Sequence, residues 1–182
     1  MPGIAWGDGS LWIGDNVHSR VYRINPTTGR ERTYAIPGSV DDIAFGNGAL
    51  WVVDTADGKI TRIDARTERA VADVLDSFAA LGDIAIGGGY AWVTDQTNDA
   101  VWRVSTDLAS KTRIPVGSRP DDVSYGDDAA WVANFGDDTI SKIDPDLGQQ
   151  IGTFAVAVHP RSVAAIDGEI WVAGDIPGTD FS

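Results

Sequence analysis

The stretch Asn47-Gly48-Ala49-Leu50-Trp51-Val52 decides the fold, because its pattern occurs five times along the chain. Each copy has a two-residue turn of Asp, Asn or Gly, then two further residues, a tryptophan and a β-branched residue. The interval between successive copies is nearly constant, and a period of about 40 residues is typical of a four-stranded propeller blade. The tryptophans are Trp12, Trp51, Trp92, Trp131 and Trp171.

The turn pairs predict a tight hairpin before every tryptophan strand. A type I′ turn needs positive φ at both central residues, which Asn, Asp and Gly tolerate best. The glycines at 87–89 belong to this series and are not expected to form a phosphate loop, because a strand and not a helix follows them. The five pairs are Asp8-Gly9, Asn47-Gly48, Gly88-Gly89, Asp127-Asp128 and Asp167-Gly168.

A third strand is predicted after each of the first four tryptophan strands. These segments are short, rich in β-branched residues and bounded by Gly, Asp or Pro. Their apolar residues fall on both faces, as expected for a sheet covered by a neighbour on each side. They span residues 20–24, 59–63, 100–104 and 139–143, and more polar fourth strands follow, for example at 30–34 and 149–153.

The fold class predicted is all-β, a single β-propeller domain over residues 1–182. Four complete four-stranded blades are expected at about residues 3–38, 39–80, 81–117 and 118–158. A partial fifth at 159–174 has strands at 162–166 and 169–173. We expect the chain to be part of a larger ring, or a protomer whose ring is completed by self-association, since an open arc exposes apolar blade faces.

Composition narrows the possible partners. The chain has 27 acidic and 14 basic residues and a formal net charge of -13, which disfavours nucleic acid and anionic membrane surfaces. No apolar run is long enough for a membrane span, and no signal peptide is recognisable at the start. The absence of cysteine excludes disulfides and thiolate chemistry.

A column of aspartates, Asp42, Asp83 and Asp122, directly precedes the apolar start of three innermost strands. Converging carboxylates suit a hard cation such as Ca²⁺ or Mg²⁺, or raise one another's pKa to give a general base. The structural alternative is that each Asp accepts backbone N–H groups at a loop-to-strand junction. Asp41 and Asp121 extend the same loops and join the column as candidate ligand-binding residues.

A second column, Asp15, Asp54, Asp95 and Asn134, closes the tryptophan strands and is expected to serve turn chemistry. Phe135, in the loop after Asn134, is a further candidate, placed to stack on a sugar or a basic ligand. The extra aromatics Trp6, Tyr22 and Trp102 are expected to pack in the core. His18 is expected to lie in a solvated loop.

The stretches 116–123, 128–134 and 139–145 resemble the YVTN family of propeller repeats, with NHL propellers and streptogramin B lyase in the wider neighbourhood. The resemblance implies a propeller fold and an extracytoplasmic or secreted location. The histidine that the lyase family carries after a proline, where it resembles a general base, has no counterpart in 40–43, 82–84, 120–123 or 160–163. His159 precedes its proline instead.

Two functions follow as hypotheses. The first is a non-catalytic scaffold that presents an acidic channel mouth to a protein or small-molecule ligand. The second is a metal-dependent lyase- or lactonase-like enzyme, with a cation held by Asp42, Asp83 and Asp122. A fold alone does not decide between them.

Overall fold

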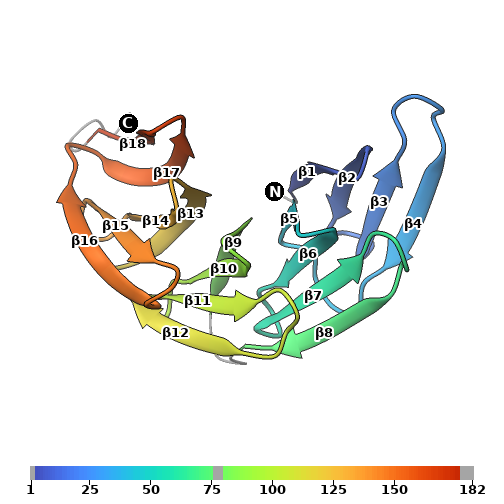
Figure 1. Cartoon of the computed structure of the whole chain (residues 1–182), viewed down its shortest axis with the longest axis horizontal. Coiled ribbons are helices and arrows are strands. Elements are labelled where there is room, and N and C mark those ends of the chain that lie inside the picture. Colours follow the sequence, from blue (N-terminus) through green and yellow to red (C-terminus); the bar gives the residue numbers. More distant parts are fainter. Residues whose placement is uncertain (1–2, 76–79, 177–182) are drawn as a thin grey trace. The chain divides into compact units, whose positions relative to one another are not determined.

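The computed structural model describes residues 3–75 and 80–176, which form eighteen strands and no helix (Figure 1). The chain divides into two compact units, residues 1–84 and 85–182. Within the described ranges, no helix is long and apolar enough to cross a membrane.

The first unit holds two complete blades. Each is an antiparallel sheet whose four strands pair in chain order. Blade one comprises β1 (Ile4–Gly7), β2 (Ser10–Asp15), β3 (Arg20–Ile24) and β4 (Glu31–Ala35). Blade two comprises β5 (Asp42–Gly46), β6 (Ala49–Asp54), β7 (Lys59–Asp64) and β8 (Ala70–Val74).

The second unit continues the same pattern. Blade three comprises β9 (Leu81–Gly87), within which the chain passes from one unit to the other, β10 (Tyr90–Asp95), β11 (Ala100–Ser105) and β12 (Lys111–Pro115). Blade four comprises β13 (Pro120–Gly126), β14 (Ala129–Asn134), β15 (Thr139–Asp144) and β16 (Gln149–Ala155). The described part of blade five is a two-stranded sheet of β17 (His159–Ile166) and β18 (Glu169–Asp175).

The predicted turns and blades are confirmed. All ten residues of the five turn pairs have positive φ, from 49° at Asn47 to 83° at Gly89, as type I′ hairpins require. Each turn joins the first strand of its blade to the tryptophan strand. The strands of blade five extend beyond the predicted 162–166 and 169–173, because β17 continues through a bulge at Pro160–Ser162 and pairs with the end of β18.

Three of the buried indoles form a hydrogen bond within their own blade, and two of them stack on the next blade. The Nε1 atoms of Trp12, Trp92 and Trp131 donate to the carbonyl five residues earlier, at 3.1, 3.1 and 3.2 Å. Trp12 stacks on Phe45 of blade two, with 5.9 Å between ring centroids, and Trp92 stacks on Tyr125 of blade four at 6.3 Å. In each of these pairs, the two blades therefore share one apolar cluster.

A cation in the third strand latches blades together at the end that carries the hairpin turns, here called the turn end. Arg23 Nη1 donates to the carbonyl of Ala65 at 2.9 Å, and Arg103 Nη1 donates to the carbonyl of Pro145 at 2.5 Å. Both acceptors belong to the next blade. This latch was missed from the sequence, although Arg23, Arg62, Arg103 and Lys142 occupy the same position relative to the preceding repeat tryptophan.

Trp6 departs from its expected place in the core. Its side chain is 62% exposed, whereas Trp12 is fully buried. Successive residues of a strand alternate between faces. Ala5, which packs into the cluster shared by blades one and two, faces blade two, so Trp6 faces the opposite side. Within the described part of the first unit, no further sheet covers that side.

Replacing Arg23 by methionine is expected to lower the stability of the protein, because its guanidinium group also bonds Ser10 and Asp8. Loss of the latch should cost about 1 kcal/mol, the usual net value of such hydrogen bonds. The thermal unfolding midpoint measures it. The matched control is Arg30→Met, which removes an exposed arginine from the same blade. Equal midpoints for the two variants would contradict the latch.

Candidate functional site

The end of each blade opposite the hairpin turns is here called the loop end. Of the aspartates predicted there, Asp42 and Asp122 bind backbone N–H groups. Asp42 Oδ2 accepts a hydrogen bond from the N–H of Ile84 at 3.2 Å, and Asp122 Oδ2 accepts from Val163 at 2.7 Å. In both cases the donor lies in the first strand of the next blade. The carboxylates thus join neighbouring blades.

Asp41 and Asp121 form a second set of inter-blade contacts. Asn16 Nδ2 donates to Asp41 at 2.8 Å, and Gln96 Nε2 donates to Asp121 at 2.9 Å. Both amides follow the tryptophan strand of the preceding blade. Asp41 also accepts from the N–H of Thr55 at 2.8 Å. These carboxylates hold loops of adjacent blades against each other.

The three aspartates that were predicted to hold a metal ion do not all belong to one unit. Asp42 and the half-buried Asp83 belong to the first unit, and Asp122 belongs to the second. Among the residues that the structure describes, no group of three or more His, Asp or Glu side chains is placed to hold a metal ion. The contacts of Asp42 and Asp122 described above are those of hydrogen-bond acceptors for backbone N–H groups.

The second column closes the loops that follow the tryptophan strands. Oδ1 of Asp15, Asp54 and Asp95 accepts the N–H three residues on, at 3.1 to 3.2 Å. Burial would raise the pKa of Asp54, but hydrogen bonds from Ser39, the Asp57 backbone and Lys59 outweigh it and lower that pKa. A hydrogen bond from the exposed His18 lowers the pKa of Asp15.

Asn134, fully buried, closes the corresponding loop of blade four differently. Its Nδ2 donates to the hydroxyl groups of Thr139 and Ser141, at 3.0 and 2.9 Å. These two hydrogen bonds fix the start of the loop, and Phe135 is the first residue of that loop.

Phe135 is the centre of a cluster of charged side chains at the loop end of the second unit. The guanidinium carbons of Arg119 and Arg161 lie over its ring, 4.5 and 4.3 Å from the centroid. The ring of His159 lies 5.6 Å away. A ligand that reaches this half-buried ring also meets guanidinium groups, which bind carboxylates and planar groups well.

Two members of the cluster, His159 and Arg161, are oriented by carboxylates. His159 Nδ1 lies 2.5 Å from Asp138 Oδ1, and because a carboxylate only accepts, Nδ1 carries the proton of this bond. Arg161 Nε donates to Asp175 at 2.6 Å, and its pKa is raised by this bond. The Arg119 guanidinium makes no hydrogen bond or ion pair to a described residue.

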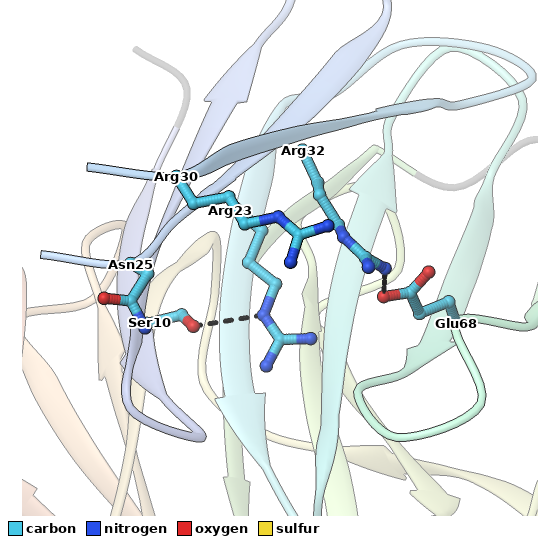
Figure 2. A pocket seen from close by; sticks show the side chains of 6 residues that line it. All are labelled: Ser10, Arg23, Asn25, Arg30, Arg32 and Glu68. Atoms are coloured by element: carbon cyan, nitrogen blue, oxygen red, sulfur yellow. Dashed lines mark hydrogen bonds and ion pairs between the residues drawn. The ribbon is translucent and has the colours of Figure 1, made fainter. Parts of the chain in front are cut away.

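A different pocket lies at the turn end of the first unit, with a volume of about 220 Å³. Figure 2 shows three guanidinium groups around it, from Arg23, Arg30 and Arg32. Arg32 is paired with Glu68, and Arg23 with Asp8. The Arg30 guanidinium has no such bond within the described residues, so this pocket can offer one unneutralised cation to an anionic group.

Three-dimensional comparison places the fold among propellers. No family model and no curated protein matches the chain. A streptogramin B lyase structure matches with TM-score 0.84 and 18% identity, over 98% of this chain and 69% of that one. A catalytically inactive histidine-to-alanine variant of virginiamycin B lyase from Staphylococcus aureus, with quinupristin, matches with TM-score 0.80 and 21% identity, over 97% and 70%.

Hydrazine synthase from Kuenenia stuttgartiensis matches with TM-score 0.71 and 17% identity, over 85% of this chain and 49% of that one. At such identities the likeness shows the fold alone. The expected β-propeller, distantly similar to streptogramin B lyase, is confirmed.

Replacing Asp122 by alanine should destabilise the protein, because the N–H of Val163 loses its acceptor. The expected loss is about 1 kcal/mol. Asp122→Asn should lose less stability, since its carboxamide oxygen can still accept the hydrogen bond from Val163. A metal site, by contrast, would lose its ion in both variants. Urea denaturation compares them with Asp146→Ala, an exposed carboxylate in a turn of the same blade. A destabilised Asp146→Ala with an unaffected Asp122→Ala would refute the role.

Proposed function

We propose that this chain is a non-catalytic propeller scaffold that binds a ligand or a protein at its acidic loop end. One observation carries the proposal: Asp42 and Asp122, the carboxylates best placed by the repeat for chemistry, accept strand N–H groups of the next blade. A carboxylate used in this way fixes the scaffold. It leaves recognition to the side chains on the loops, as is usual for binding sites built on rigid frames.

The cluster around Phe135 is the proposed contact surface. Its ring is half-buried, Arg119 is exposed, and Asp137 and Asp138 bring negative charge into the same loop. An aromatic ring with charged groups of both signs suits a partner that offers a flat apolar part and polar groups beside it. The resemblance to YVTN repeats supports an extracytoplasmic location for this binding role.

The second candidate is a lyase-like enzyme, and the pair His159–Asp138 favours it. The carboxylate at 2.5 Å orients the imidazole so that Nε2 can act as a general base. Arg161 and Arg119, over the neighbouring Phe135, would stabilise negative charge on a substrate oxygen. The three-dimensional likeness to streptogramin B lyase makes a streptogramin B compound the natural test substrate.

Incubation with quinupristin distinguishes the two functions. For the scaffold, we expect chromatography to show the same conversion with the protein, with His159→Ala and with no protein. The reason is that orientation of one base does not by itself supply an active site. Conversion by the unchanged protein that His159→Ala abolishes would overturn the scaffold and establish the enzyme. Asp138→Asn is the matched control for the orienting carboxylate.

A metal-dependent form of the enzyme would need Ca²⁺ or Mg²⁺ at Asp42, Asp83 and Asp122. Calorimetric titration with each cation is expected to give no saturable heat, because Asp42 and Asp122 are engaged by backbone donors. Saturable binding that disappears in Asp42→Asn would contradict this expectation. Asp146→Asn, an exposed aspartate of a turn, controls for the loss of one charge.

A further inference from the structure

The pocket at the turn end of the first unit lies where blades one and two meet, and both of these blades are complete. Its volume is about 220 Å³, and blade one supplies all of its lining residues except Glu68. Glu68 comes from the turn between β7 and β8 of blade two. A water molecule takes about 30 Å³ in the liquid, so the pocket has room for an anion with several oxygen atoms.

Strand register places two like charges opposite each other in this pocket. Arg23 of β3 is the cross-strand partner of Arg32 of β4. In the other complete blades, the residue opposite the corresponding cation is uncharged: Val71, Thr112 or Gly152. Like charges directly opposite each other destabilise a sheet. Blade one therefore concentrates positive charge at this pocket, although the chain as a whole has a formal net charge of -13.

Glu68 supplies a counter-charge from a position where blades one and four have glycine. Its N–H donates to the carbonyl four residues earlier, as the N–H groups of Gly29 and Gly148 do. All three residues have positive φ, 60° at Glu68, 68° at Gly29 and 62° at Gly148. This left-handed conformation strains a residue that has a Cβ atom and does not strain glycine. The carboxylate is kept here despite that strain, and it pairs with Arg32.

Two side chains of the pocket have donors without an acceptor among the described residues. One is the guanidinium group of Arg30, and Figure 2 shows this side chain extending toward the pair of Arg32 and Glu68. The other is the amide of Asn25. Its Oδ1 accepts from two backbone N–H groups of its own turn, at 3.0 and 2.9 Å, which leaves Nδ2 as the donor it can offer.

The ligand that these donors favour is an anion with two charges. The pair of Arg32 and Glu68 is open to solvent, with 44% and 37% of the two side chains exposed, and such a pair contributes little stability. Because Glu68 is tethered beside Arg32, a free carboxylate with one charge competes poorly with it. A phosphate group has a second charge and further oxygens, so it can bond Arg30 and Arg32 together. Guanidinium groups match phosphate oxygens in bidentate geometry.

From these contacts we infer that the turn-end pocket binds a phosphate group, either free or carried by a small monoester. Glu68 is the internal counter-ion that the phosphate displaces from Arg32. The phosphate oxygens accept hydrogen bonds from Arg30, Arg32 and Asn25. The site lies in the first unit and shares no side chain with the loop-end surface around Phe135, so it is a function additional to loop-end binding.

Calorimetric titration of the full chain with inorganic phosphate and with glycerol phosphate tests the site. The titrations use low salt and a pH of about 7.5, where a phosphate monoester is mostly doubly charged. We expect saturable binding, and the tighter of the two compounds shows whether the site takes the free ion or a monoester. Acetate, which has one charge, should bind at least about tenfold more weakly. No saturable heat with either phosphate compound, or acetate binding of equal strength, would overturn the inference.

An arginine pair provides a matched comparison. Arg30→Met should weaken phosphate binding about tenfold, because hydrogen bonds to a charged group are lost. Arg69→Met should leave it unchanged. Arg69 has the position in blade two that Arg30 has in blade one, since the carbonyl of each accepts the N–H five residues earlier, and Arg69 does not line the pocket. Equal phosphate affinities of the two variants would contradict the site.

Glu68→Gln separates a displaceable counter-ion from a purely structural ion pair. It should tighten phosphate binding severalfold, because Arg32 is released. Glu68→Gly should bind phosphate as tightly and unfold at a higher temperature than Glu68→Gln, since glycine relieves the backbone strain. Lower stability of Glu68→Gln with unchanged phosphate affinity would overturn the inference. Phe135→Ala should leave phosphate binding unchanged, and a loss of binding in that variant would place the phosphate at the loop end instead.

Discussion

The indole in the second strand of each blade is the constraint on which the rest depends. A single four-stranded sheet cannot bury a side chain of that size, so Trp12 and Trp92 reach full burial only against the next blade, where Phe45 and Tyr125 stack on them. The indole N–H groups of Trp12 and Trp92 are satisfied inside their own blades by the carbonyl before the hairpin. Each repeat thus depends on its neighbour for apolar cover.

Polar contacts at both ends of the blades add hydrogen bonds between neighbouring blades to this apolar packing. At the turn end Arg23 and Arg103 reach carbonyl groups of the following blade. At the loop end Asp42 and Asp122 reach N–H groups of the following blade. Charged side chains of both signs therefore hold blades together, and the side chains that we propose for recognition are those that depart from the repeat, such as Phe135, Arg119 and His159.

The sequence was enough to predict the period, the type I′ turns and the third strands, because each is a local property of the chain. It could not decide between a cation site and a backbone cap for Asp42, since the two differ only in what the next blade places beside the carboxylate. The burial of Trp6 was wrongly predicted for a related reason: its exposure depends on whether another sheet covers the face of β1 that points away from blade two. The cation latch had a visible signal, a basic residue at a constant distance after each of four tryptophans, but its role appears only in the contacts.

The five repeat tryptophans occupy the same position in their blades and differ in how far they are covered, Trp171 being 62% exposed and the other four buried. Hydrogen exchange of the indole N–H groups, followed by nuclear magnetic resonance, tests it directly. The account predicts slow exchange for Trp12, Trp51, Trp92 and Trp131, and fast exchange for Trp6 and Trp171. Fast exchange of the four central indoles, or protection of Trp171 equal to theirs in the isolated chain, would contradict it.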